Sequence, residues 1–240
     1  MELREGIILK TLKYQENSKI AYIITKEGLV TALIRASLEY KSKNFSYSQE
    51  LTKIEFDISK SKKNSFDILT SGRLIESYLN IKKDYNTLFE ISKIIDITYK
   101  SIEHVTNNQN LYLLFDYLLD NYNKYFERQN KQYYLLIFKL KLLYLLGVGP
   151  IFNKCVKCQK IINDNNLIFS IERGGCICKN CIDINDVIYK DDFLSIIKIL
   201  YLGKLDKLNQ ELIDKISLEF YMEIDDFIKK YYQKYLSLQI

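Results

Sequence analysis

The sequence contains no tryptophan, one proline, eight glycines and one histidine in 240 residues. A single proline excludes proline-rich linkers and collagen-like repeats. No G-x-G-x-x-G or Walker A pattern is present, so a glycine-rich loop that binds nucleotide phosphates is not expected. The only histidine, His104, has no positioned nucleophile or carboxylate partner that the sequence suggests. We therefore expect a protein without a catalytic centre.

Long hydrophobic runs are also missing. The most apolar stretch, Tyr133–Leu146, is too short to span a bilayer and contains Lys139 and Lys141. The first ten residues, MELREGIILK, carry acidic residues and no apolar run of signal-peptide length. We expect no membrane partner and a cytoplasmic, nucleoid-associated location.

The composition is that of a folded protein, with 48% hydrophobic and 27% charged residues. A chain of this length can bury roughly 70% of its unfolded surface, so its hydrophobic core does not need disulfide bonds to be stable. The formal net charge of +5 comes from 35 basic and 30 acidic residues. Such a mild excess permits an anionic partner without requiring one, and an argument for nucleic acid depends on where the charges lie.

Residues 1–78 are expected to form a small antiparallel β-barrel. Short runs of β-branched and aromatic residues alternate there with polar clusters, which is typical of strands joined by turns. The expected strands are Gly6–Leu12, Lys19–Thr25, Leu29–Leu38, Phe45–Ser59 and Ser65–Tyr78. Five strands of this size fit the barrel that binds oligonucleotides and oligosaccharides (the OB-fold), and a five-stranded SH3-like barrel fits nearly as well.

From about residue 80 the apolar residues recur every three or four positions, which predicts helices. The expected helices are Tyr85–Val105, Leu111–Phe126, Lys131–Leu146, Asp191–Leu202, Leu208–Leu218 and Glu219–Leu238. In the first of them the expected buried face is Leu88, Ile91, Ile95, Thr98 and Ile102. The fold class is therefore α+β, with a barrel at 1–78, helices at 79–150, a cysteine-containing insert at 151–189 and further helices at 190–240.

All five cysteines lie between residues 155 and 181. Cys155-x-x-Cys158 and Cys178-x-x-Cys181 are two C-x2-C pairs separated by nineteen residues, a spacing typical of a four-thiolate zinc site. Four sulfur ligands leave no open position for water, so the expected zinc ion is structural. Cys176 could replace Cys178 as a ligand, but the C-x2-C preference favours a spare thiol.

The basic residues of the expected barrel are candidates for contacts with a phosphate backbone. They are Lys10, Lys13, Lys19, Arg35, Lys41, Lys43, Lys60, Lys62 and Lys63. Tyr14, Tyr22, Tyr40, Phe45 and Tyr47 could supply rings on which bases stack. A second interpretation stays open, because lysine-rich loops are often only solvated and the aromatic residues of a small barrel often fill its core.

Two stretches of the sequence resemble the RecO family of bacterial recombination mediators. The first runs from Gly6 to Lys10 and on through Tyr14, Glu16, Ser18 and Ile20 to Thr25 and Gly28. The second is FKLKLLYLLGVGPIFNKCVKC, Phe138 to Cys158, followed by Phe169, Gly174-Gly175, Cys178 and Cys181. The order of barrel, helices, cysteine insert and further helices is similar as well, so the resemblance covers essentially the whole chain.

The resemblance implies a protein that has no catalytic centre and binds single- and double-stranded DNA. It implies annealing of complementary strands and, together with RecR, loading of RecA on DNA that is coated by single-strand-binding protein. A contact with the C-terminal tail of the single-strand-binding protein is implied too. Two other functions remain open: a zinc-stapled adaptor between proteins without DNA affinity of its own, and an RNA-binding module.

Overall fold

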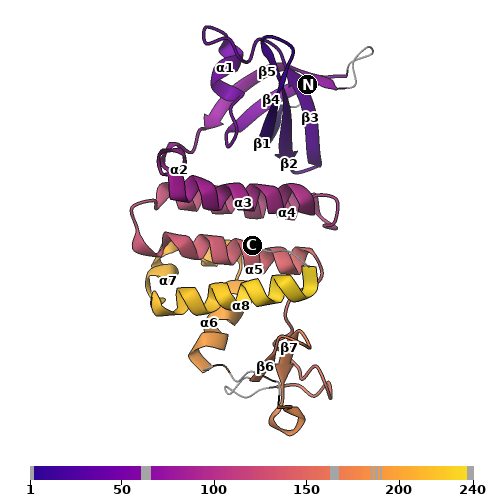
Figure 1. Cartoon of the computed structure of the whole chain (residues 1–240), viewed down its shortest axis with the longest axis vertical. Helices are drawn as coiled ribbons and strands as arrows, with labels where there is room; N and C mark the ends of the chain where they lie inside the picture. Colours follow the sequence, from indigo (N-terminus) through magenta and orange to yellow (C-terminus); the bar gives the residue numbers. More distant parts are fainter. Residues whose placement is uncertain are drawn as a thin grey trace. The chain divides into compact units, whose positions relative to one another are not determined.

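The computed structural model describes residues 3–60, 66–162, 168–184, 186, 189 and 191–236. The chain divides into two compact units, Met1–Lys124 and Tyr125–Ile240. The first contains strands β1–β5 and helices α1–α4, and the second contains helices α5–α8 and strands β6–β7 (Figure 1). Each unit has its own buried core, and the two are described separately.

The first unit is built around a closed five-stranded barrel. Its elements are β1 (Arg4–Tyr14), β2 (Ser18–Thr25), β3 (Gly28–Ile34), α1 (Lys43–Tyr47), β4 (Lys53–Ser59) and β5 (Asp67–Glu76). The strand order is β1-β2-β3-β5-β4, and β4 pairs with β1 to close the barrel. The pair of β3 and β5 is parallel and the others are antiparallel. This connectivity, with a helix between β3 and β4, confirms the predicted OB-type barrel.

The interior of the barrel is filled by every second side chain along each strand. Residues with inward-facing side chains lie two apart, as Ala21 and Ile23 do on β2, because successive side chains point to opposite faces of a strand. The buried cluster comprises Ile8, Ala21, Ile23, Ala32, Ile34, Tyr47, Ile54, Phe56 and Leu69. At Gly72 a Cβ would lie 2.6 Å from the ring of Tyr47, so glycine is needed there for the ring to enter the core.

Helices α2 (Leu79–Lys83), α3 (Tyr85–Ser101) and α4 (Asn108–Lys124) complete the first unit. A polar network fixes α4 to the barrel. Lys53 of β4 lies 2.8 Å from the Asp116 carboxylate, and the Tyr112 hydroxyl donates a 2.7 Å hydrogen bond to Glu5 of β1. The α4 helix also contacts β2 and β3. One side of the barrel is therefore closed by helices of its own unit.

Several predicted boundaries in this unit were wrong. The fourth strand begins at Lys53, because Ser42 caps a short helix over Lys43–Tyr47 by accepting a hydrogen bond from the Asn44 N–H. The third strand ends at Ile34, and α2 was not predicted. The buried face of α3 also differs: Leu88 is exposed and Ile95 is half-buried, while Thr87 and Ile94 face the core.

The second unit is built on α5 (Tyr133–Leu145), which is apolar on all sides and buried along most of its length. It packs against α6 (Asp191–Leu202) and α8 (Glu219–Leu236), with α7 (Gln210–Asp214) between them in the chain. The predicted bounds of α6 agree with the structure. Lys141 donates to the carbonyls of Tyr201 and Gly203 at the end of α6, where a cation suits the helix dipole. Among the helices of the described residues, none is long and apolar enough to cross a membrane.

A buried ion pair joins α5 to α8. The ammonium of Lys139 lies 3.0 Å from the Asp225 carboxylate, and both side chains are almost fully buried. Asp225→Leu would leave Lys139 charged and without a partner, so we expect about 3–5 kcal/mol loss in the free energy of unfolding. Urea denaturation measures this loss. Lys139→Met in the Asp225→Leu background should recover most of it, since a well-packed apolar pair can replace a buried ion pair.

The neighbouring Asp226 supplies a matched control, because its 2.6 Å pair with Lys230 is exposed. Asp226→Asn should cost at most about 1 kcal/mol. Asp225 also gives a pH dependence: burial alone would raise its pKa, but hydrogen bonds and charges from Lys229 and Lys139 lower it below the usual value. Its contribution is present above the unfolded pKa of about 4 and is lost as the pH falls through the lower folded pKa. Equal losses for both variants would contradict this assignment.

Candidate metal centre and nucleic-acid interface

The first cysteine pair lies in a tight turn after α5. The Cys155 N–H donates to the Lys160 carbonyl, and the Gln159 N–H donates back to the Cys155 carbonyl, each at 2.8 Å. Gln159 adopts a left-handed conformation with φ 63°, which lets the chain reverse after Cys158. This backbone turn directs both sulfurs of the pair to the same side.

The second cysteine pair follows a two-stranded hairpin of β6 (Ile168–Ser170) and β7 (Gly175–Ile177). The Cys181 N–H donates to the Cys178 carbonyl at 2.8 Å, which closes the second turn. The two turns are held together by the backbone, since the Val156 N–H donates to the Cys176 carbonyl at 2.9 Å. The sequence contained the cysteine spacing but gave no prediction of this hairpin.

The structure brings together the four predicted cysteines, Cys155, Cys158, Cys178 and Cys181. Their Sγ atoms all lie within 4.8 Å of one another, and the Cys158 and Cys178 sulfurs are 3.7 Å apart. A tetrahedral ion with metal–sulfur bonds of about 2.3 Å requires sulfur–sulfur distances of about 3.8 Å. Four cysteines in this arrangement could hold one metal ion.

The surroundings of the four sulfurs shift their pKa values in different directions, because a hydrogen bond with Cys178 raises the pKa of Cys181 to about 12 while that of Cys155 is lowered. Burial raises the pKa of Cys155, but backbone N–H groups of Cys158, Cys178 and Lys157 hydrogen-bond its sulfur and lower the pKa to about 6. Cys176 lies outside the cluster, and burial raises the pKa of its thiol to about 12. Lys157, inside the first cysteine pair, lies 3.6 Å from the Asp183 carboxylate.

Most of the predicted basic residues lie in three segments of the barrel, which we call the three connections. They are residues 13–17 at the end of β1 and the turn after it, residues 35–43 between β3 and the start of α1, and residues 59–60 at the end of β4. The β1–β2 turn lies beside the chain that follows β3, because the Leu38 N–H donates to the Asn17 carbonyl at 3.1 Å. The start of β5 pairs both with the end of β3 and with Ser59 at the end of β4. The strand pairing places the three connections at one end of the barrel, and they contain Lys13, Arg35, Lys41, Lys43 and Lys60.

These five side chains are exposed, and within the described part of the chain none of them forms an ion pair. Lys10 is exposed on β1, opposite Tyr22 of β2. Lys19 differs from the others, because its half-buried ammonium donates to the Ser48 carbonyl and to the Gln49 side chain, both at 3.2 Å. Burial lowers the Lys19 pKa. Lys62 and Lys63 lie outside the described residues.

The candidate stacking residues have different surroundings. Tyr47 is buried in the barrel core, so the suggestion that it stacks on bases was wrong. The ring of Tyr14 packs edge-on to Phe66, and that of Tyr22 packs edge-on to Tyr99 of α3. Tyr40 is 85% exposed. Sequence alone could not distinguish these roles, which depend on contacts between distant segments.

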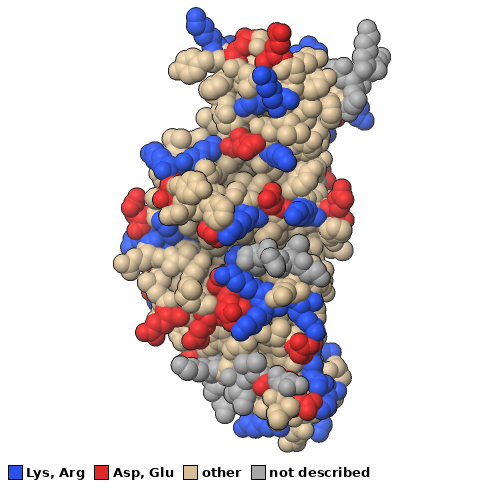
Figure 2. Space-filling view, in the orientation of Figure 1, with Lys and Arg blue, Asp and Glu red and all other residues tan. Residues whose placement is uncertain are grey.

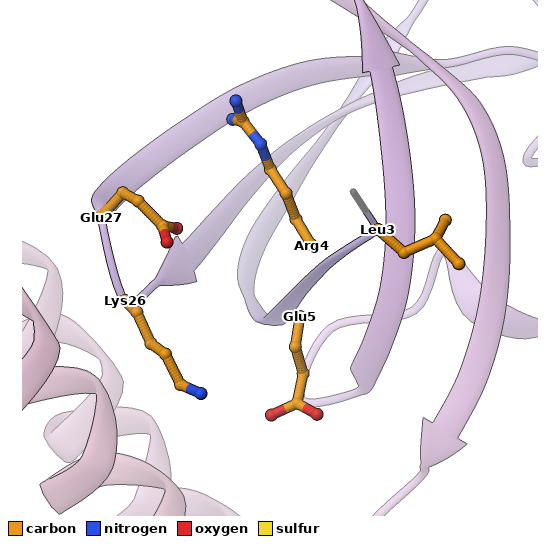
Figure 3. Close-up of a pocket in the computed structure, with 5 residues that line it drawn as sticks. All are labelled: Leu3, Arg4, Glu5, Lys26 and Glu27. Carbon is orange, nitrogen blue, oxygen red and sulfur yellow. The ribbon is translucent and has the colours of Figure 1, made fainter. Parts of the chain in front are cut away.

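A hollow of about 580 Å³ lies where the start of β1 faces the β2–β3 turn (Figure 3). Its lining carries two cations, Arg4 and Lys26, and two carboxylates, Glu5 and Glu27, so opposite charges are balanced. Figure 2 shows the same mixture on a larger scale, with basic and acidic side chains interspersed over the visible face. The lining of the hollow therefore has no net excess of cations that would attract an anionic polymer.

The fold and the cysteine cluster define a class: an OB-type barrel with a helical region that contains a four-cysteine candidate metal site. Two family models match the chain, "Recombination protein O N terminal" over residues 1–78 and "Recombination protein O C terminal" over residues 82–240. Together they account for nearly all of the sequence. The chain belongs to the RecO family of DNA repair proteins.

Curated relatives agree with the family models. The chain is similar to a protein named DNA repair protein RecO from Halalkalibacterium halodurans, with 27% identity over 98% of this chain and 90% of the relative. It shares 29% identity with the protein of that name from Caldicellulosiruptor saccharolyticus, over 88% of this chain and 84% of the relative. A relative of the same name from Bacillus cereus is 30% identical over 72% of this chain and 68% of the relative.

Proposed function

We propose that this protein is a recombination mediator that binds single- and double-stranded DNA and anneals complementary strands. The observation that carries the proposal is the match of both family models, end to end, on a chain whose barrel is of the OB type. With RecR, the protein would help RecA load on DNA coated by single-strand-binding protein, whose C-terminal tail it would contact. The site of action would be the cytoplasm.

The proposed mechanism requires no chemical step by the protein. Exposed cations at the three barrel connections would bind phosphates of any sequence and release condensed counterions. Because the lysines would neutralise phosphate charge, the repulsion between two bound strands would fall, and complementary bases could meet and pair. Because base contacts are not needed for this step, the protein would act on strands of any sequence.

The four cysteines would hold a structural zinc ion. Four thiolates complete a tetrahedral shell, so the ion would stabilise the insert and leave no position for a substrate. Both cysteine turns and the β6–β7 hairpin would then form one cross-linked element. Metal ligands must be deprotonated, and the backbone hydrogen bonds that lower the pKa of Cys155 favour the thiolate form of that ligand.

A salt titration tests the proposed function. The zinc-loaded protein is titrated into a labelled single-stranded oligonucleotide at several salt concentrations, and complementary strands are added to measure annealing. We expect log affinity to fall linearly with log salt concentration, by about 0.7 per phosphate contact with a single strand, and annealing to accelerate. Absence of binding at low salt would instead favour the adaptor function. Stronger binding to RNA of the same sequence would favour the RNA-binding function.

A further inference from the structure

Tyr40 is the most exposed of the barrel's candidate stacking residues. It lies in the connection between β3 and α1 and is 85% exposed, although a tyrosine ring usually buries much of its surface. The ring of Phe45 packs edge-to-face with it, with ring centres 5.6 Å apart and an interplanar angle of 63°. This contact orients the Tyr40 ring while leaving most of its surface open to a ligand.

The backbone around Tyr40 is fixed by hydrogen bonds. On one side the Leu38 N–H donates to the Asn17 carbonyl, and the Asn17 side chain donates to the Glu39 carboxylate at 2.8 Å. On the other side the Ser42 N–H donates to the Glu39 carbonyl at 2.9 Å, which forms a turn across Tyr40. A ring on a fixed turn loses little conformational entropy when it binds a flat partner.

The charges near Tyr40 in the chain select an anionic ligand. Arg35, Lys41 and Lys43 are exposed, and in the described residues none of them has a carboxylate partner. The single acidic residue of the segment 35–43 is Glu39, whose carboxylate accepts the hydrogen bond from Asn17. Cations around an open aromatic ring are the combination that binds a polymer of phosphates and flat bases.

The side of the barrel that commonly binds oligonucleotides in OB-folds, the outer face of β2 and β3, is partly covered here. Tyr22 of β2 packs on Tyr99 of α3, and α4 contacts both strands. A strand of DNA is therefore better accommodated at the three connections. In a duplex the bases are already stacked on one another, so only an unpaired base can reach the ring of Tyr40.

We infer that Tyr40 stacks on a base of single-stranded DNA and gives this protein a preference for unpaired over paired strands. The inference rests on the proposed function and deepens it. It predicts that two contributions to the binding free energy can be measured separately. The lysines bind the phosphates of any nucleic acid, while Tyr40 binds only accessible bases.

The absence of tryptophan from the sequence offers a direct test, because Tyr40→Trp would introduce a single tryptophan. We expect an oligo-dT strand to quench its fluorescence strongly, and an abasic strand of equal length to quench it little. Tyr85→Trp is the matched control, since Tyr85 is 80% exposed at the start of α3 in the same unit. Equal quenching at the two positions would overturn the inference.

Affinity measurements complete the test. Tyr40→Ala should weaken oligo-dT binding about 5- to 150-fold, the range for loss of one stacked base, and Tyr40→Phe should retain it. Affinity for duplex DNA and for the abasic strand should not change. If the unmodified protein binds DNA and Tyr40→Ala binds oligo-dT equally well, the inference fails and the proposed function stands. If the unmodified protein binds no DNA, the proposed function fails. Preference for oligo-rU over oligo-dT would overturn the choice of DNA.

Discussion

Cys178→Ser is expected to abolish stable zinc binding and to lower the melting temperature of the second unit. The Cys178 sulfur lies 3.7 Å from that of Cys158, about the edge length of a tetrahedral zinc–sulfur site, and a serine hydroxyl is a poor replacement for a thiolate. Structural zinc sites contribute on the order of 10–16 kcal/mol of binding free energy, and much of that stabilises the fold. Zinc content after dialysis against a chelator and calorimetric melting curves measure the two effects.

The fifth cysteine provides the matched control. Cys176 is buried two residues before Cys178 and is outside the sulfur cluster. Cys176→Ala should therefore retain one zinc ion per chain and lose only the stability that its packing supplies. If Cys176→Ala lost zinc while Cys178→Ser kept it, Cys176 would replace Cys178 in the ligand set, which is the alternative that the sequence left open.

The zinc variants also test whether the ion is separate from the proposed DNA contacts. The cysteines belong to the second unit and the basic connections to the first. A structural ion should therefore affect the stability of its own unit, while the barrel retains its intrinsic affinity for single-stranded DNA. Loss of single-strand binding in proportion to loss of zinc would show that the DNA contacts extend into the second unit.

The features that sequence predicted well are those set by local pattern. The clustering of the four cysteines follows from two short spacings, and the bounds of α6 follow from its apolar period and the glycine that ends it. The barrel was predicted because five runs of strand-forming residues are separated by polar turns. Its closure by β1 and β4, and thus the choice between OB-type and SH3-like topology, depends on pairing between distant segments.

The features that sequence predicted poorly depend on long-range contacts. Phe45–Tyr47 has the composition of a strand, but the Ser42 cap and the burial of Tyr47 against Gly72 favour a helical turn. Tyr40 and Tyr47 lie only seven residues apart in the sequence, yet one is exposed and the other is in the core. From the sequence Lys19 is likewise expected to be a surface cation, but its ammonium donates a hydrogen bond to the Ser48 carbonyl. Whether such a residue is buried or exposed is decided by its packing against distant segments, which the local sequence does not show.

Reversing two charges beside Tyr40 should weaken the binding of all DNA. Lys41→Glu combined with Lys43→Glu removes two exposed cations and introduces repulsion with phosphates, so we expect at least about a tenfold loss in affinity at low salt. The slope of log affinity against log salt should decrease by about 1.4 for single strands and about 1.8 for duplexes, if each lysine contacts one phosphate. Salt titrations with single-stranded and duplex oligonucleotides measure both slopes.

Lys83→Glu combined with Lys100→Glu is the control, because it changes the net charge of the same unit by the same amount. Both residues are exposed, on α2 and in the last turn of α3, and lie outside the three basic connections. If the overall charge of the unit were responsible for DNA binding, the two double variants would lose affinity equally. If the connections form the binding site, only the Lys41/Lys43 variant should change the slope. The Lys41/Lys43 variant should bind both single strands and duplexes more weakly, because both contain phosphates. Tyr40→Ala should weaken the binding of single strands only, because only they have accessible bases.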